Sequence, residues 1–142
     1  MLVEKIHKED TNPVFVYTTC TDRNEARLIA MQCIGERLAV CADFWAINSI
    51  YPWQTVIQDV DQYMLVLTTQ KSLSEQLMKF IEGIHSYAVP VIAECDIQIA
   101  TQPYKFWIQE SLESTQPFIT REEYDKQLQT EEEGNYHPGQ LK

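Results

Sequence analysis

Apolar and polar residues follow one another along this chain in blocks that predict alternating strands and helices. Residues 14 to 19 form a β-branched and aromatic run of strand length directly after Pro13, which is typical of a strand covered on both faces. Apolar residues then recur at helical spacing as far as Arg37, and Asp22 with Glu25 has the spacing of a capping box. The chain therefore begins with a strand followed by a helix.

The next stretch, Leu38 to Trp53, carries two of the three tryptophans and one charged residue. So much apolar surface has to be buried, against its own domain or against another copy of the chain. Most strands have about 3 to 10 residues, so we expect a bend or a bulge near residues 46 to 48. Pro52 puts the end of this strand at an edge or beyond the sheet, and Gln54-Thr55 is the expected reversal.

A second half repeats this order. Residues 56 to 69 form an extended segment interrupted by polar positions 58 to 62, and a capping box at Ser72 and Glu75 starts a helix that ends near His85. Apolar residues alternate with mostly polar ones over residues 91 to 99, which predicts a strand with its apolar face on the helices and its other face toward solvent or a polar site. The fold class is α+β, a ferredoxin-like βαββαβ arrangement with a four-stranded antiparallel sheet and an extended hairpin between strands two and three. The open sheet face is the expected binding or oligomer surface.

Beyond this unit, residues 104 to 108 predict a short helix carrying Trp107, and Thr120 starts another that runs to about Gln129. We divide the chain into a flexible lead-in at 1–12, a ferredoxin-like domain at 13–112, and an acidic, partly helical extension at 113–142 that ends in a flexible tail.

Composition excludes several classes of function. The net charge of −10 opposes binding to a phosphate backbone, so we predict no nucleic-acid partner. No apolar run has the length of a signal peptide or membrane span, which predicts a cytoplasmic protein without a membrane partner. Four dispersed cysteines without a CxxC pair are expected to be free and mainly buried thiols. GxSxG, P-loop, GxGxxG and HExxH motifs are absent, so we predict that the protein is not an enzyme.

The ordered set of motifs resembles the CutA family of divalent-cation-tolerance proteins. The matching elements are Thr18 to Asp22, Glu36 to Ala39 with Cys41, Ser49 to Tyr51 with Trp53, His85 with Tyr87 and Pro90, and Tyr104 with Trp107. The resemblance implies a compact homotrimer in which the long hairpin reaches a neighbouring subunit, similar in plan to PII-type signalling proteins. It also implies a role in metal tolerance, with copper or another divalent ion bound at cysteine and histidine positions.

Two residues are the best candidates for metal ligands. His85 ends the second helix, where it could act as a helix cap or as a metal ligand. Cys20 precedes the first helix, whose N-terminus could lower the pKa of the thiol, and a soft ion such as Cu(I) would suit it. A third ligand would come from Glu94, from Asp96 or from a second subunit. Cys33 and Cys41 are assigned to packing.

Four aromatic residues allow two interpretations. They can line a ligand pocket or anchor a subunit interface, because aromatic side chains are enriched in both settings. The family resemblance favours the interface. The residues are Tyr51, Trp53, Tyr87 and Trp107.

Several charges of the family pattern are replaced in this chain. Gln54 and Thr55 stand where the family has Glu-Gly, Gln62 and Thr68 replace charged residues, and Val91 replaces a glutamate.

From the family resemblance we hypothesise a trimeric CutA-like protein that acts in copper or divalent-metal tolerance by binding. The alternatives are a PII-like module that binds a small ligand at the subunit clefts, or a scaffold that has lost the metal site.

Overall fold

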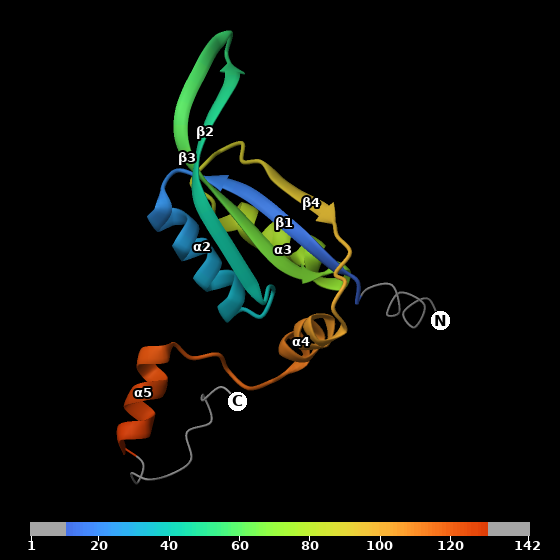
Figure 1. The fold of residues 1–142 in the computed structure, drawn as a ribbon. Helices are drawn as coiled ribbons and strands as arrows, with labels where there is room; N and C mark the ends of the chain where they lie inside the picture. The colour runs from blue at the N-terminus through green and yellow to red at the C-terminus, as the bar shows by residue number, and fades with distance from the viewer. Residues whose placement is uncertain (1–10, 131–142) are drawn as a thin grey trace.

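The computed structural model describes residues 11–130, which form a four-stranded sheet with two helices on one face and two further helices beyond its end (Figure 1). The predicted lead-in up to residue 10 and the predicted tail from residue 131 lie outside the described residues. The elements in chain order are β1 (Pro13–Cys20), α2 (Arg23–Gly35), β2 (Cys41–Trp53), β3 (Val56–Gln70), α3 (Lys71–Ile84), β4 (Ile92–Asp96), α4 (Gln102–Glu113) and α5 (Arg121–Thr130). The predicted ferredoxin-like order βαββαβ is confirmed, and the helix at residues 104–108 is longer than predicted.

The sheet is antiparallel with the strand order β2-β3-β1-β4. Helices α2 and α3 lie on one of its faces (Figure 1). The core between sheet and helices is apolar, because alternate strand residues point toward the helices and the helices present their apolar stripes. Its fully buried members include Val16, Ile29, Leu65, Leu77 and Ile81.

The opposite sheet face is covered far less. Phe15, Tyr17, Met64 and Val66 alternate with the core residues and are half-buried, and Trp45 is 48% exposed. The expectation that β1 is covered on both faces is therefore met on the helix side alone. We call this surface the open face of the sheet.

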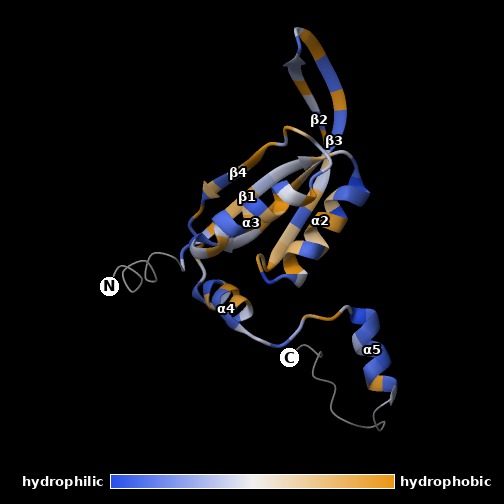
Figure 2. Cartoon of the chain, turned by 180° about the vertical axis from the view of Figure 1, so that it is seen from behind, coloured by the Kyte–Doolittle hydropathy of each residue, from blue (hydrophilic) through white to orange (hydrophobic). Residues whose placement is uncertain are grey.

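Strands β2 and β3 form one uninterrupted hairpin. Every residue from Cys41 to Trp53 has a partner in β3, and the register does not change along the strand, so there is no bulge near residues 46 to 48. Likewise, the polar positions 58 to 62 do not interrupt β3. Pairing with a similarly long partner keeps both strands extended beyond the usual strand length. Because β1 ends at Cys20, opposite Tyr63, the outer half of the hairpin projects beyond the sheet (Figures 1 and 2).

The predicted reversal at residues 54 and 55 is confirmed. Gln54 and Thr55 have φ values of 50° and 69°, the left-handed conformation that a two-residue hairpin turn requires. Glycine or asparagine adopts this conformation at lower energy than a β-branched threonine does. The pairing of β2 with β3 therefore imposes this turn, although its two residues do not favour the conformation.

Strand β4 is oriented opposite to the prediction. Glu94 pairs with Val16, and Ile92 packs against the core, so these two residues lie on the helix side. The apolar residues Ala93 and Cys95 lie on the open face instead. The alternation was predicted correctly, but the face was not, because Glu94 finds a cationic partner, Lys71, at the start of α3.

The C-terminal helices leave the sheet at the end opposite the hairpin (Figure 1). Arg37 contacts the last turn of α4 and the segment that follows it. Its guanidinium donates a hydrogen bond of 2.7 Å to the carbonyl oxygen of Ser111 in α4 and another to the carbonyl oxygen of Gln116, and it lies 3.9 Å from the ring centre of Phe118. None of the helices within residues 11–130 is long and apolar enough to cross a membrane. The domain boundaries drawn from the sequence remain a prediction.

Candidate metal centre

Three potential ligands meet where the projecting hairpin leaves the sheet. Cys20 ends β1, Glu25 lies in the first turn of α2, and His85 is the C-cap residue of α3. A sulfur, a carboxylate oxygen and an imidazole nitrogen from these residues all lie within 4.8 Å of one another. The fold therefore brings together Cys20 and His85, which are 65 residues apart in the sequence.

Both ring nitrogens of His85 have protein partners. Nδ1 accepts a hydrogen bond of 3.0 Å from the backbone N–H of Tyr87, so in the neutral ring Nε2 carries the hydrogen. Nε2 lies 2.9 Å from the carbonyl oxygen of Thr19, to which it donates, and 3.1 Å from the hydroxyl of Thr18. His85 thus ties the loop after α3 to the end of β1.

The site residue that sequence reasoning missed is Glu25. Its carboxylate accepts hydrogen bonds from the backbone N–H groups of Thr21, at 2.8 Å, and Ser86, at 3.0 Å. Burial acts to raise the pKa of Glu25, but the hydrogen bonds with Ser86 and Thr21 outweigh it and hold the pKa below its usual value of 4.5. The signal was present in the capping box, because the N3 residue of such a box points back toward the chain that precedes the helix.

The expectation of an acidic thiol at Cys20 is wrong. Cys20 is fully buried, and burial, followed by the nearby charges of Glu25 and Asp22, raises the pKa of its thiol to about 12. These effects exceed any lowering by the N-terminus of α2. Without a bound ion, Cys20 is a protonated core residue.

The ligand types suit a metal ion with a preference for sulfur and nitrogen. Thiolate and imidazole ligands select copper and zinc, and a carboxylate can complete such a set. Ligand atoms on one tetrahedral zinc ion lie roughly 3.5 Å apart, so small side-chain movements would bring these three residues into range. However, His85 and Glu25 would have to exchange their present hydrogen-bond partners for the ion.

An open groove lies directly beside this group. It has a volume of about 880 Å³ and extends from the loop after α3 along the projecting part of the hairpin as far as Trp53, next to the turn. Its walls carry the aromatic side chains of Tyr51, Trp53 and Tyr87, three of the four predicted aromatic site residues. The remaining lining residues are Thr19, Thr21, Ser49, Ile50, Gln58, Val60, Asp61, Gln62, Ser86, Ala88, Val89 and Val91.

Tyr87 links the groove to the hairpin. Its hydroxyl donates a hydrogen bond of 3.0 Å to the side-chain carbonyl of Gln62, and its ring centre lies 4.9 Å from that of His85. Gln62 is 7% exposed and occupies a position where the family pattern has an acidic residue. A neutral amide is buried here at a lower cost than a carboxylate would be.

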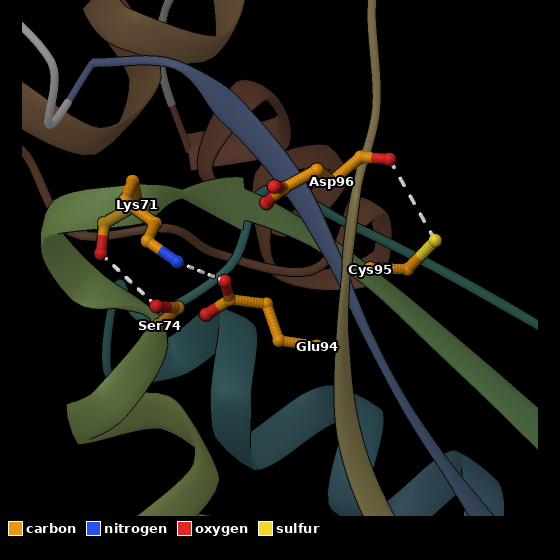
Figure 3. Close-up of polar contacts among 5 residues, drawn as sticks. All are labelled: Lys71, Ser74, Glu94, Cys95 and Asp96. Carbon is orange, nitrogen blue, oxygen red and sulfur yellow. Dashed lines mark hydrogen bonds and ion pairs between the residues drawn. The ribbon is translucent and has the colours of Figure 1, made fainter.

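The other two predicted site residues lie at the opposite end of the sheet. Glu94 forms an ion pair with Lys71 at the start of α3 (Figure 3), and this pairing lowers the pKa of its carboxyl. It is not among the three grouped ligands. Trp107 is on α4, where its ring stacks on Tyr104 with 5.4 Å between centres. Trp107 is 44% exposed and does not line the groove.

Cys41, assigned to packing, is half-buried on the open face beside Asp43. Cys33 is in the core, as predicted, and Cys95 is exposed on β4. The prediction of mainly buried thiols therefore holds for Cys20 and Cys33 but not for the other two.

The fold and the site together define a ferredoxin-like α+β protein with a projecting hairpin and a sulfur, nitrogen and oxygen ligand group at its base. The family model of the CutA1 divalent ion tolerance protein matches residues 14–111. The chain belongs to this family, and the resemblance inferred from its motifs is confirmed.

Relatives and solved structures agree with this assignment. Human Protein CutA is 30% identical over 105 residues, which cover 73% of this chain and 59% of the human protein. The probable divalent-cation tolerance protein cutA homolog of Encephalitozoon cuniculi is 30% identical over 103 residues, which cover 72% of this chain and 90% of that protein. The crystal structure of the divalent ion tolerance protein CutA1 from Ehrlichia chaffeensis has a TM-score of 0.70 and 25% identity, covering 72% of this chain and 97% of that one.

Proposed function

We propose that this protein binds a divalent metal ion, copper foremost, at Cys20, His85 and Glu25, and contributes to metal tolerance by binding and not by catalysis. The observation that carries the proposal is the convergence of the three ligand atoms within 4.8 Å. Cys20 would supply a thiolate, His85 an imidazole nitrogen and Glu25 a carboxylate oxygen. Because the Cys20 thiol is protonated in the resting chain and a ligating thiolate is not, binding through Cys20 has to release that proton.

Calorimetry with copper or zinc tests this proposal. We expect Cys20→Ser and His85→Ala each to weaken binding at least about 10-fold, since even the outer-shell partners of a metal ligand are worth that much. Cys95→Ser and Glu94→Gln are matched controls, because they remove a thiol and a carboxylate outside the group, and they should leave the affinity unchanged. Absence of metal uptake by the unaltered chain, or equal loss in the controls, would refute the ligand assignment.

A homotrimer is the assembly we propose. The support is apolar surface that the single chain leaves uncovered: Ile50, Trp53 and Ile57 on the hairpin are 68%, 51% and 75% exposed. By the strand register Ile50 and Ile57 lie on one face of the hairpin and Trp53 on the other, so both faces carry exposed apolar side chains of the kind that mark an interaction site. Tyr51, Trp53, Tyr87 and Trp107 are the proposed interface residues, and the cytoplasm, where free thiols persist, is the proposed location. Trp53→Ala should lower the mass measured by light scattering, and an unchanged trimer would oppose this role.

The groove supports a second candidate function, the binding of a small molecule as in PII-type modules. Its lining contains one carboxylate, Asp61, and no lysine, arginine or histidine. A site of this composition favours neutral or cationic aromatic-stacking ligands over nucleotides. A thermal-shift screen tests this function, because a ligand that binds the native state alone raises the melting temperature. No shift with any neutral or cationic compound would count against it.

A further inference from the structure

Helix α2 carries apolar side chains on the side that faces away from the sheet. Leu28 and Met31 are 57% and 46% exposed, whereas Ile29 on the opposite side of the helix is buried. Asn24, Leu28, Met31 and Gly35 follow one another at intervals of four, three and four residues, which is the spacing with which one helix packs against another. The space beside Gly35 is open, so a second helix can approach closely there. We call these four residues the α2 seam.

The charges beside the α2 seam are positive. Arg23 and Arg27 lie one turn apart along its side, and neither forms an ion pair within residues 11–130. Arg23 lies 5.7 Å from the ring centre of Phe44. The only carboxylate in α2, Glu25, accepts hydrogen bonds from two backbone N–H groups of neighbouring loops. A partner that fits this face therefore combines apolar side chains with negative charge.

Helix α5 has both properties. None of its ten residues is fully buried, and it lies apart from the sheet and its two covering helices (Figures 1 and 2). Tyr124 and Leu128, one turn apart, form its apolar side. The helix has three carboxylates against two cations, and the sequence continues with three glutamates at positions 131 to 133.

Local interactions hold α5 in shape. The N–H of Thr120 donates to the carboxylate of Glu123 at 2.7 Å, and the N–H of Glu123 donates to the hydroxyl of Thr120 at 3.1 Å. Two ion pairs between residues one turn apart lie along the surface of the helix. A helix of this length is marginal in water unless it packs against another element. The chain therefore maintains a preformed helix that its own core does not use.

Arg37 determines where α5 begins. Its guanidinium lies 3.9 Å from the ring centre of Phe118, two residues before Thr120, which caps α5. Because Arg37 directly follows α2, α5 starts beyond the C-terminal end of α2 and runs away from it (Figure 1). The apolar side of α5 and the α2 seam of the same chain therefore do not meet, and a second copy of the chain supplies both missing partners.

We propose that α5 of one copy docks on the α2 seam of a second copy. Tyr124 and Leu128 pack against Leu28 and Met31, and the carboxylates of α5 lie toward Arg27. Each copy gives its α5 and receives that of the other, so two equal contacts form about a two-fold axis. The family model ends at residue 111, so α5 lies outside the region that it matches.

The two surfaces contain none of the proposed metal ligands and none of the proposed hairpin interface residues. The inference therefore does not depend on either of those proposals. A trimer formed through the hairpin would leave α2 and α5 available for this second contact.

Sedimentation of the full chain over a range of concentrations tests the exchange. We expect the mass to rise with concentration, and Leu28→Glu and Leu128→Glu each to lower the association constant at least about 10-fold, because burial of one leucine side chain is worth that factor. Gln76→Glu is the matched control, since it adds the same charge to an exposed position on α3, and it should change nothing. A mass that does not depend on concentration, or that both helix variants leave unchanged, would refute the proposal.

Mixing the two variants identifies the surfaces that meet. Leu28→Glu retains an intact α5, and Leu128→Glu retains an intact α2 seam, so the mixture can form one of the two contacts. It should associate more strongly than either variant alone, which also shows that both variants are folded. Loss of association in only one variant would indicate that α2 pairs with α2, or α5 with α5, and would overturn the exchange, as would a mixture that associates no better than its components.

Discussion

The two ends of α3 are attached to the sheet by different chemistry. At its C-terminus, His85 and Glu25 accept or donate four hydrogen bonds with backbone groups of two loops. At its N-terminus, Lys71 pairs with Glu94 through long side chains, one of which is 48% exposed (Figure 3). The first attachment holds four backbone groups, whereas the second combines this side-chain ion pair with one backbone hydrogen bond, 2.9 Å from the N–H of Lys71 to the carbonyl oxygen of Asn12. A single substitution at the hairpin end of α3 should therefore disturb more of the backbone than one at the other end.

The largest difference between the two ends should appear in stability. His85→Ala leaves the Thr19 carbonyl and the Tyr87 N–H without their partner, so we expect a loss of about 1–3 kcal/mol of unfolding free energy. Glu94→Gln removes a partly exposed ion pair and should cost less than about 1 kcal/mol. Urea unfolding monitored by circular dichroism measures both. Equal losses would mean that the two attachments contribute equally.

Acid should distinguish the hairpin end from the rest of the chain through Glu25. The pKa of Glu25 is below 4.5 in the folded protein, so its carboxylate stabilises the fold above pH 4.5. That contribution is lost as the pH falls from 4.5 through the lower folded pKa, because the folded state then has to take up the proton. In Glu25→Gln, urea midpoints should be lower at pH 7 and should fall less between pH 5 and pH 3. Parallel pH curves for the two proteins would contradict this prediction.

At the α4 end, a single guanidinium holds the start of the C-terminal extension. Arg37→Asn removes both hydrogen bonds and the contact with Phe118, and asparagine tolerates the φ of 59° at this position. We expect several-fold faster chymotrypsin cleavage after Phe118, because the released segment fits a protease more readily. Arg37→Lys keeps the charge but not the planar guanidinium group, so its cleavage rate should lie between those of the unaltered chain and Arg37→Asn. Unchanged cleavage would show that Arg37 does not hold the segment.

The smallest effect is expected at the hairpin turn. Thr55→Gly places glycine at a φ of 69°, where a β-branched residue is strained, and should stabilise the turn by about 1 kcal/mol or less. Slower hydrogen exchange of amides in residues 50 to 60, with no change in α3, would be the result. An equal slowing of hydrogen exchange at all amides would mean that the projecting hairpin unfolds together with the sheet.

Sequence periodicity predicted the elements well because each strand and helix carries its own pattern. What it missed depends on contacts between elements. The side of the sheet to which Glu94 points is decided by Lys71, which lies 23 residues earlier in the chain. The unbroken register of β2 is decided by its partner β3. The carboxylate of Glu25 joined the site because the loop after α3 returns to the same place.

The candidate site was predicted in part for a similar reason. Cys20 and His85 were found from residue type and from the family motifs, and the fold brings them together. The protonation of Cys20 could not be inferred, because its burial is a property of the packed core. The family motifs indicated which residues come together. The burial that sets the pKa of a group, in contrast, depends on the packing of the whole domain.

The projecting hairpin has a further consequence for solubility. Strand β1 stops at Cys20, opposite Tyr63, so within residues 11–130 the outer edge of β3 from Val56 to Gln62 pairs with no other strand. An exposed apolar strand edge is a template for uncontrolled strand addition. Asp59 and Asp61 lie on this edge, and Pro52 lies opposite it in β2. These residues act as gatekeepers against fibril-like growth, so the arm can remain extended and apolar without recruiting unrelated chains.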